Sequence, residues 1–378
     1  MHKDGFSRRS FLGNIAAGST GAALLSLPAV AHAAAGEAAA EPPWPVTVES
    51  YPLQEPGKTA SLARFKLATQ DEIPAAYQQK LLAYAPTLDL TLCRDEEQLR
   101  REVADAHVIL GHFSREDLRA AHQLRWIQYT AAGVEEILYP ELVNSPIVLT
   151  NMQRMYSPTI SETAIGLLLT LTRGLNRYTL QTREHVWKRV DGLTEISGLT
   201  LGIVGLGGIG TDTAYRAHYG FNMKILAVDP KPLPKPAFVA ELHSLDWLPK
   251  MVPQVDVLLS AAPHTPVSEG MFNEKIFRAM KPTAYFINVS RGKLVDTPAL
   301  MRALKEGWIA GAGLDVTDRE PLPPDDPLWT AGNLIITSHT SAVSEGSTQR
   351  CYNLFCENIR RYVSGLPLLN VVDKKRGY

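Results

Sequence analysis

The chain has 378 residues, of which 45% are hydrophobic and 20% charged, and its formal net charge is −1 at pH 7. This length exceeds what one hydrophobic core usually supports, so we expect two domains of ordinary globular composition. The near-neutral charge argues against a nucleic-acid-binding protein, and the cysteines (Cys93, Cys351 and Cys356) lack the spacing of a disulfide framework or a metal site.

The first 33 residues have the three parts of a secretory signal peptide. Lys3, Arg8 and Arg9 form a positive start, an Ala-, Gly- and Leu-rich stretch follows, and residues 31–33 (AHA) form a small-x-small cleavage site. Polar residues interrupt the apolar stretch, which falls short of the ~18 continuous apolar residues of a spanning helix. We therefore expect residues 1–33 to be removed and the mature protein to carry no membrane anchor.

Residues 7–12, SRRSFL, resemble the twin-arginine export signal. A basic tail without a targeting role is the alternative. The twin-arginine route carries folded cargo, and a cofactor is acquired in the cytoplasm before export. The segment therefore predicts a periplasmic protein, exported folded by the twin-arginine machinery and retaining its cofactor.

In the first half of the chain, after a proline-rich linker at residues 42–45, short apolar runs alternate with helix-like segments. The predicted strands are 64–68, 89–93, 107–111, 126–129 and 147–150, with helices such as 75–84 and 114–121 between them. This alternation predicts a parallel sheet covered by helices. A helix that begins at Ser157 and Pro158 is apolar on nearly all sides, so we expect it to be buried at a domain or subunit interface.

From Leu199 a second alternation begins. The predicted strands are 201–205, 225–228, 255–259, 284–289, 311–316 and 334–337, and a closing helix near 347–364 ends before Gly365. The sequence therefore predicts an α/β fold with two doubly wound parallel-sheet domains.

The second alternation opens with a glycine-rich turn. Gly205, Gly207 and Gly210 form G-x-G-x-x-G directly after an apolar strand and at the start of a helix. The first glycine permits a tight turn, the second lets the backbone approach a pyrophosphate, and the third lets helix and strand pack closely. The helix start offers the amides of Gly208 and Ile209 to phosphate oxygens. A turn that serves packing alone is the alternative; in this context the motif predicts a bound dinucleotide.

An acidic residue suggests which dinucleotide binds. Asp229 closes the next strand, 19 residues after Gly210, where a carboxylate accepts hydrogen bonds from the adenosine ribose and repels a 2′-phosphate. Lys231 would partly neutralise such a phosphate. The carboxylate favours NAD as the cofactor over NADP.

Three side chains that can carry out hydride-transfer chemistry follow strand ends in the last third: Arg291, Glu320 and His339. Ligands of open α/β sheets bind at such ends. Hydride transfer to a 2-oxo carbon builds negative charge on oxygen, which an imidazole can meet with a proton. A glutamate would orient the ring, and an arginine would grip carboxylate and carbonyl oxygens in a fork. Each residue also has an alternative role without catalysis. Arg291 could form a surface ion pair, Glu320 could be a solvated acid of a loop, and His339 could be an interior histidine with its hydrogen bonds satisfied.

The chain resembles the D-isomer-specific 2-hydroxyacid dehydrogenases over roughly residues 60–370. The motifs that carry the likeness stand in family order: QYTAAGVEEI, the helix with Glu162, GLGGIG, APHTPVSEGMFN, INVSRGKLVDTPAL, GLDVTDREPL and SHTSA. Two positions depart from the family pattern. Ser338 replaces the proline usual before the histidine, and AAPHTP replaces a more apolar segment. Neither departure removes a catalytic group.

This resemblance implies an NAD-dependent dehydrogenase or reductase of a small 2-oxo or 2-hydroxy acid of the D series. It implies a flavodoxin-like substrate domain, residues 46–150 plus 346–378, and a dinucleotide-binding Rossmann domain, residues 151–345. The two domains would close on each other, and two subunits would pair through their nucleotide domains as a homodimer. A non-catalytic NAD-sensing binding protein and a dehydrogenase for another small anion such as phosphite are the alternatives.

The resemblance also implies a role for each site residue. Arg291 would bind substrate, Glu320 would partner the histidine, and His339 would be the acid/base. The other implied contacts are the amides of Ala131, Ala132 and Gly133 for the substrate carboxylate, Asp315 for the nicotinamide carboxamide, and Ala262, Val289, Ser290 and Arg291 along the cofactor.

Overall fold

The computed structural model describes residues 64–378. The predicted signal peptide, its cleavage site and the proline-rich linker lie outside the described residues. Between residues 64 and 378, no helix combines the length and the apolar character needed to cross a membrane.

The first sheet is formed by five parallel strands in the order β2-β1-β3-β4-β5. Its order changes direction between β1 and β3, which is where ligands approach open α/β sheets. Capping side chains define its helices: Asp95 accepts from the amide of Gln98, and Ser114 and Asp117 form a capping box. The strands are β1 (Phe65–Thr69), β2 (Leu88–Leu92), β3 (Val108–Leu110), β4 (Trp126–Gln128) and β5 (Val148–Thr150), and the helices are α1 (Ala75–Tyr84), α2 (Glu96–Glu102), α3 (Arg115–Ala120) and α4 (Pro140–Val143).

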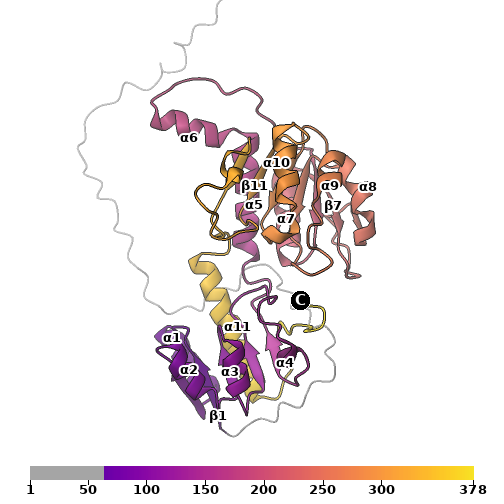
Figure 1. Ribbon diagram of the computed structural model, residues 1–378. Coiled ribbons are helices and arrows are strands. Elements are labelled where there is room, and N and C mark those ends of the chain that lie inside the picture. The colour runs from indigo at the N-terminus through magenta and orange to yellow at the C-terminus, as the bar shows by residue number, and fades with distance from the viewer. Residues whose placement is uncertain (1–63) are drawn as a thin grey trace, which may run out of the picture. The chain divides into compact units, whose positions relative to one another are not determined.

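The C-terminal helix α11 (Glu345–Val363) packs against this first sheet, although it is far away in sequence (Figure 1). Phe355 and Tyr362 on its apolar face meet Trp126 of β4, with ring centroids 6.1 and 5.3 Å apart. Asn358, fully buried, donates to Gln128 Oε1. The aromatic packing and this buried hydrogen bond fix the helix on the sheet.

The second sheet has seven parallel strands in the order β12-β11-β10-β9-β6-β7-β8. The strand order changes direction between β6 and β9, and the glycine-rich turn follows β6 at this switch point. The strands are β6 (Thr200–Val204), β7 (Lys224–Val228), β8 (Glu241–His243), β9 (Val257–Ser260), β10 (Tyr285–Asn288), β11 (Gly311–Leu314) and β12 (Leu334–Ile336). Two parallel α/β sheets confirm the predicted fold class.

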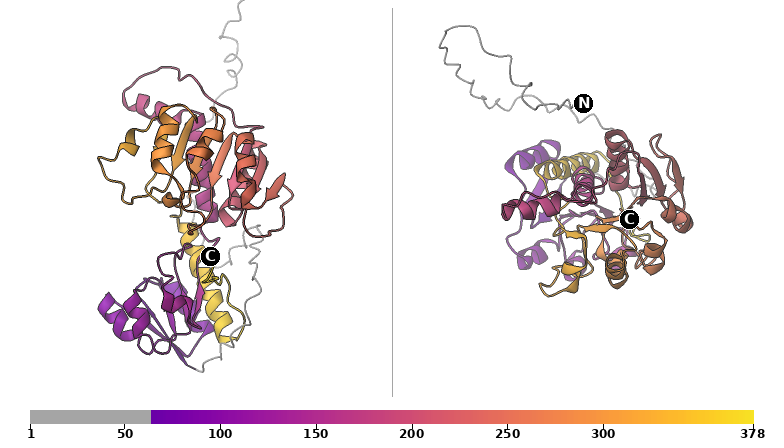
Figure 2. Two further views of the ribbon diagram at one scale, coloured as in Figure 1. Left: turned by 45° about the vertical axis from the view of Figure 1, so that its right-hand side comes forward. Right: turned by 90° about the horizontal axis from the view of Figure 1, so that it is seen from above.

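Helices cover both faces of the seven-stranded sheet (Figure 2). Successive β6 residues show why: Ile203 packs with one helix layer and Val204 with the other, as the alternation of side chains along a strand requires. One layer holds α5 (Ser157–Thr172) and α7 (Gly208–Phe221), and the other holds α8 (Leu248–Met251), α9 (Glu274–Ala279) and α10 (Thr297–Lys305). Helix α6 (Leu175–Arg183) and the 3₁₀ turns η1 (Leu245–Trp247), η2 (Val252–Gln254), η3 (Gly292–Leu294) and η4 (Pro327–Thr330) complete the elements.

One detail differs from the sequence-based expectations. Strand β8 was not predicted, because Glu241–His243 is a short edge strand whose side chains are not buried. Helix α5 packs on the sheet of its own domain: Leu167 lies in the core beside Gly313 of β11, and the helix also contacts α7. A subunit interface at this helix stays a prediction.

Candidate active site

The glycine-rich turn shows a different constraint at each glycine. Gly205 has φ +93°, and a Cβ there would lie 2.8 Å from the backbone of Ala261 and Ala262. A Cβ on Gly210 would lie 2.1 Å from the Gly205 carbonyl oxygen. Gly207, by contrast, has nothing within 4 Å of such a Cβ. Packing and backbone conformation thus demand the first and third glycines, whereas the second leaves open space at the start of α7, where Gly208 and Ile209 lie.

This contrast predicts different effects of two substitutions. Gly207→Ala puts a methyl group on the open side of the turn, so we expect normal thermal stability but NADH binding weaker by about tenfold or more. Gly210→Ala forces a methyl group onto the Gly205 carbonyl, so we expect a lower melting temperature. Calorimetry and NADH titration of both variants check this. Unchanged NADH affinity in Gly207→Ala would show that the pyrophosphate does not approach there.

Asp229 lies at the carboxyl end of β7, immediately beside the turn. Its Oδ2 accepts a hydrogen bond from the Leu206 amide and its Oδ1 accepts one from the Lys231 amide, both at 2.8 Å. These contacts hold the buried carboxylate against the turn. A carboxylate has about four acceptor positions, so lone pairs remain for ribose hydroxyls.

The backbone around Arg291 is fixed by a buried polar network at the end of β10. Asn288 Oδ1 accepts from the amide and hydroxyl of Ser290, and its Nδ2 donates to the Arg291 carbonyl at 2.9 Å. The Ser290 hydroxyl also lies 2.6 Å from the hydroxyl of Ser260 on β9. Val289 and Ala262 are buried beside these strand ends. The predicted cofactor-lining residues therefore gather at neighbouring strand ends.

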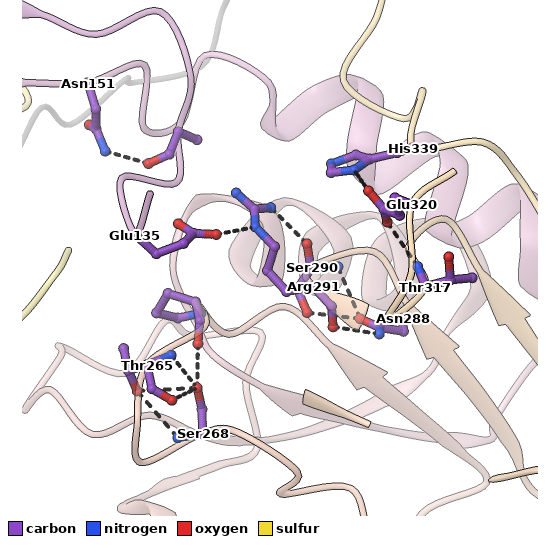
Figure 3. A network of polar contacts seen from close by, with 12 residues as sticks. Glu135, Asn151, Thr265, Ser268, Asn288, Ser290, Arg291, Thr317, Glu320 and His339 are labelled. Atoms are coloured by element: carbon purple, nitrogen blue, oxygen red, sulfur yellow. Dashed lines mark hydrogen bonds and ion pairs between the residues drawn. The ribbon is translucent and has the colours of Figure 1, made fainter. Parts of the chain in front are cut away.

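The Arg291 side chain meets the loop after β4, which contains the predicted substrate-binding residues (Figure 3). Its Nε donates to Glu135 Oε1 at 2.5 Å, and its Nη1 donates to the Ser290 carbonyl. A Cβ on Gly133 would lie only 2.0 Å from Arg291 Nη2. Burial would raise the pKa of Glu135, but the Arg291 guanidinium outweighs burial and holds the pKa below its ordinary value.

The carbonyls of the same loop accept hydrogen bonds from residues that precede α5. The Met152 amide donates to the Ala131 carbonyl at 3.0 Å, and Asn151 Nδ2 donates to the Ala132 carbonyl at 2.6 Å. Ala131 and Gly133 are partly exposed, and Ala132 is exposed. The segment that leads into α5 therefore fixes the orientation of the peptide groups that the sequence predicts to bind substrate.

His339 and Glu320 are brought together from the loops that follow β12 and β11. His339 Nδ1 lies 2.7 Å from Glu320 Oε2, and Glu320 Oε1 accepts from the Thr317 amide at 2.9 Å (Figure 3). When Nδ1–H donates to the carboxylate, Nε2 is the ring nitrogen left for a substrate. His339 also has φ +53°, a left-handed conformation that costs free energy and is concentrated at functional sites.

Asp315 fixes the loop that carries His339. Its buried carboxylate accepts from Thr337 Oγ1 at 2.5 Å and from the amides of Thr340 and Ser341 at 3.2 Å, and its carbonyl accepts from the His339 amide at 2.8 Å. In the structure, Asp315 thus holds the His339 backbone in position. Its expected contact with a nicotinamide carboxamide stays a prediction.

Among residues 64–378, no group of three or more His, Cys, Asp or Glu side chains is placed to hold a metal ion.

Comparison with known proteins shows what this chain is similar to. The family model described as D-isomer specific 2-hydroxyacid dehydrogenase, NAD binding domain, matches residues 165–341. A glyoxylate reductase of Korarchaeum cryptofilum is 36% identical over 268 residues, which are 69% of this chain and 79% of that protein. The chain belongs to the D-isomer-specific 2-hydroxyacid dehydrogenase family. A glyoxylate reductase of Thermofilum pendens is 34% identical over 74% of the chain and 85% of its own length.

Solved structures of dehydrogenases are similar to this chain and support the same family. A D-isomer specific 2-hydroxyacid dehydrogenase family protein from Aeromonas salmonicida has a TM-score of 0.73 at 32% identity, over 83% of this chain and 100% of that chain. An NADPH-dependent glyoxylate/hydroxypyruvate reductase from Sinorhizobium meliloti, solved with NADP and sulfate, has a TM-score of 0.71 at 26% identity, over 83% and 100%. This dehydrogenase is accordingly an NAD(P)-dependent oxidoreductase that interconverts 2-oxo and 2-hydroxy acids at a CH–OH group.

Sequence reasoning missed Glu135, the partner of Arg291. The two residues are 156 positions apart, and in the sequence Glu135 looks like any solvated acid of a surface loop. Its one signal is its place, two residues after the predicted substrate-binding Gly133.

Proposed function

We propose that this dehydrogenase transfers hydride between NAD and a small 2-oxo or 2-hydroxy acid of the D series. Arg291 binds the substrate, His339 is the acid/base and Glu320 is its partner. The contact that carries the proposal is the 2.7 Å pair of His339 Nδ1 and Glu320 Oε2. It joins the loops after β12 and β11, and β11 is the sheet neighbour of β10, which Arg291 follows. A binding protein without catalysis has no need of this pair.

In the proposed mechanism, the amides of Ala131, Ala132 and Gly133 hold the substrate carboxylate. When bound, reduced nicotinamide supplies the hydride that goes to the 2-oxo carbon. The C=O π electrons move to oxygen, which takes the proton from His339 Nε2. Arg291 stabilises the negative charge on that oxygen, and Glu320 stabilises the imidazolium before it gives up the proton. In the oxidation direction, neutral His339 accepts the hydroxyl proton.

Glu135 orients the guanidinium of Arg291. By accepting from Arg291 Nε, it fixes one edge of the guanidinium, and Nη2 then lies next to Gly133. A planar fork held at one edge loses less conformational freedom when it binds an oxygen at the other edge. Glu135 is therefore a positioning residue for Arg291.

NAD is the proposed cofactor because a carboxylate at the end of β7, beside the glycine-rich turn, would repel a 2′-phosphate. Asp315 is proposed to hold the nicotinamide carboxamide, and Ala262, Val289 and Ser290 are proposed to line the cofactor. Comparison of the NADH and NADPH dissociation constants tests the preference: tighter NADPH binding would contradict it.

The activity is tested by NADH oxidation across a panel of 2-oxo acids of increasing size, together with the reverse reaction on D- and L-2-hydroxy acids and on phosphite. Glyoxylate comes first in the panel, because curated relatives are named glyoxylate reductases. We expect turnover with at least one 2-oxo acid and with D-hydroxy acids only. Turnover on phosphite alone would assign the site to a different anion, and no turnover at all would favour a binding protein.

We also infer a homodimer formed through the nucleotide domains. Helix α6 and the residues after it expose several large apolar side chains: Trp187 is fully exposed, and Leu175, Leu180 and Val186 are 48%, 59% and 44% exposed. Exposed large apolar side chains within one short segment favour an association surface, at which tryptophan is enriched. The partner proposed for this segment is a second copy of the chain.

Trp187→Ser is expected to shift the protein from dimer to monomer in sedimentation velocity at micromolar concentration. Leu82→Ser, which changes an exposed residue of α1, is the matched control and should leave the dimer intact. A parent protein that sediments as a monomer would refute the inferred homodimer, and a Trp187→Ser variant that stays dimeric would place the interface elsewhere.

The localisation proposed from the sequence is the periplasm, reached by a folded protein through the twin-arginine machinery. A dinucleotide site is filled where the dinucleotide is present, which supports cofactor loading in the cytoplasm and retention during export. Replacing Arg8 and Arg9 by Lys is expected to leave the protein in the cytoplasmic fraction. Normal export of this variant would contradict the route, and periplasmic protein purified without bound nucleotide would contradict retention.

A further inference from the structure

Two helices on one face of the seven-stranded sheet meet at their N-terminal ends. Helix α5 begins at Ser157, and helix α7 begins at Gly208 in the glycine-rich turn. A Cβ on Gly208 would lie 2.4 Å from Ser157 Oγ and 2.8 Å from Arg154 Cγ. Gly208 is not one of the three glycines of the G-x-G-x-x-G motif. The approach of Ser157 therefore explains why position 208 has no side chain.

The Ser157 hydroxyl is buried and makes no hydrogen bond within the part of the chain that the structure describes. The residue is only 4% exposed, and its Oγ has no partner there. It does not cap α5 either, because the N-cap is Tyr156 and no side chain caps this end. Ser161, one turn further along the same helix, is also buried, but its Oγ donates to the Pro158 carbonyl at 2.8 Å. An unpaired buried hydroxyl costs free energy, so Ser157 calls for a partner from outside the chain.

The surroundings of this hydroxyl favour an anion as the partner. Both α5 and α7 present the positive end of the helix dipole here, and the first amides of α7 have no acceptor within their own helix. The turn that leads into α5 is fixed, because the Ser157 amide donates to the Arg154 carbonyl at 3.2 Å and Arg350 Nε donates to the Met155 carbonyl at 2.7 Å. The hydroxyl is thus held beside Gly208, whose amide is predicted to bind phosphate.

We propose that the Ser157 hydroxyl binds the pyrophosphate of the dinucleotide, as a further donor beside the amides of Gly208 and Ile209. The hydroxyl donates to a phosphate oxygen, and a hydrogen bond to an ionised acceptor is stronger than one between neutral groups. This proposal rests on the function proposed above, in which a dinucleotide is the cofactor. It adds to the glycine-rich turn a contact from a second helix, and it gives the buried hydroxyl the partner that it lacks in the free protein.

The test compares Ser157→Ala with the parent protein after any bound nucleotide has been removed from both. We expect NADH, NADPH and ADP-ribose to bind more weakly by the same factor of about tenfold or more, because all three contain the pyrophosphate. Adenosine, which has no phosphate, should compete with NADH equally well in both proteins. The melting temperature of the nucleotide-free variant should equal or exceed that of the parent, because the hydroxyl that is removed has no partner there.

Ser161→Ala is the matched control, because it removes a buried hydroxyl of the same helix that does have a partner. It should lower the melting temperature and leave NADH affinity unchanged. Unchanged NADH affinity in Ser157→Ala, a lower melting temperature of its nucleotide-free form, or weaker adenosine binding would each overturn the proposal alone. Failure of the parent protein to bind either NADH or NADPH would overturn the proposed function as well, so the two failures are distinguishable.

Discussion

Replacing His339 by alanine is expected to lower kcat by about 100-fold or more, while the dissociation constant for NADH stays close to that of the parent protein. The reason is that His339 Nδ1 is engaged by Glu320, so its proton-transfer role falls to Nε2 and acts mainly in the transition state. Steady-state kinetics with the best 2-oxo acid and a separate NADH titration measure the two quantities.

His122→Ala is the control for this experiment, since His122 is an exposed histidine of the substrate domain. It should have parental kinetics. A His339→Ala enzyme with near-normal turnover would remove His339 from the mechanism, and loss of NADH binding would show a mainly structural role.

Arg291→Lys is expected to lower kcat/KM by about 100-fold, with a higher KM for the 2-oxo acid and a lower kcat. An ammonium cannot at the same time donate to Glu135, donate to the Ser290 carbonyl and present a planar edge beside Gly133. The measurement is a full kinetic analysis at saturating NADH, which separates the effect on KM from the effect on kcat.

Arg115→Lys is the matched control, because Arg115 also makes a forked contact with a carboxylate, Glu141, but on the surface of the substrate domain. It should leave both constants unchanged. If Arg291→Lys also leaves both unchanged, Arg291 does not bind the substrate.

The features that could be predicted from the sequence were mainly local motifs or patterns that repeat along the chain. The alternation of apolar runs indicated both parallel sheets, because each buried strand must read as an apolar run. The glycine-rich turn was predictable because its motif lies within six residues, Gly205 to Gly210, although the backbone that crowds Gly205 belongs to the distant Ala261 and Ala262. Arg291, Glu320 and His339 were recognisable because each follows a strand, and the ends of parallel strands lie at one edge of the sheet.

The features that were missed depend on contacts between distant parts of the chain. Glu135 gains its role only through Arg291, which lies 156 positions away in the sequence. The hold of Asp315 on the His339 loop also depends on tertiary structure. No local pattern marks these residues, since an acid in a loop is usually solvated.

The central claim is hydride transfer from the nicotinamide to the 2-oxo carbon, on a site that yields the D isomer. The most direct test is to incubate the enzyme, in ordinary water, with NADH deuterated at both C4 positions and with the best 2-oxo acid whose product is chiral. Mass spectrometry and chiral chromatography of the product then read its label and configuration. We expect one deuterium at C2 and the D isomer; an L product, or a product without deuterium at C2, would contradict hydride transfer at this site.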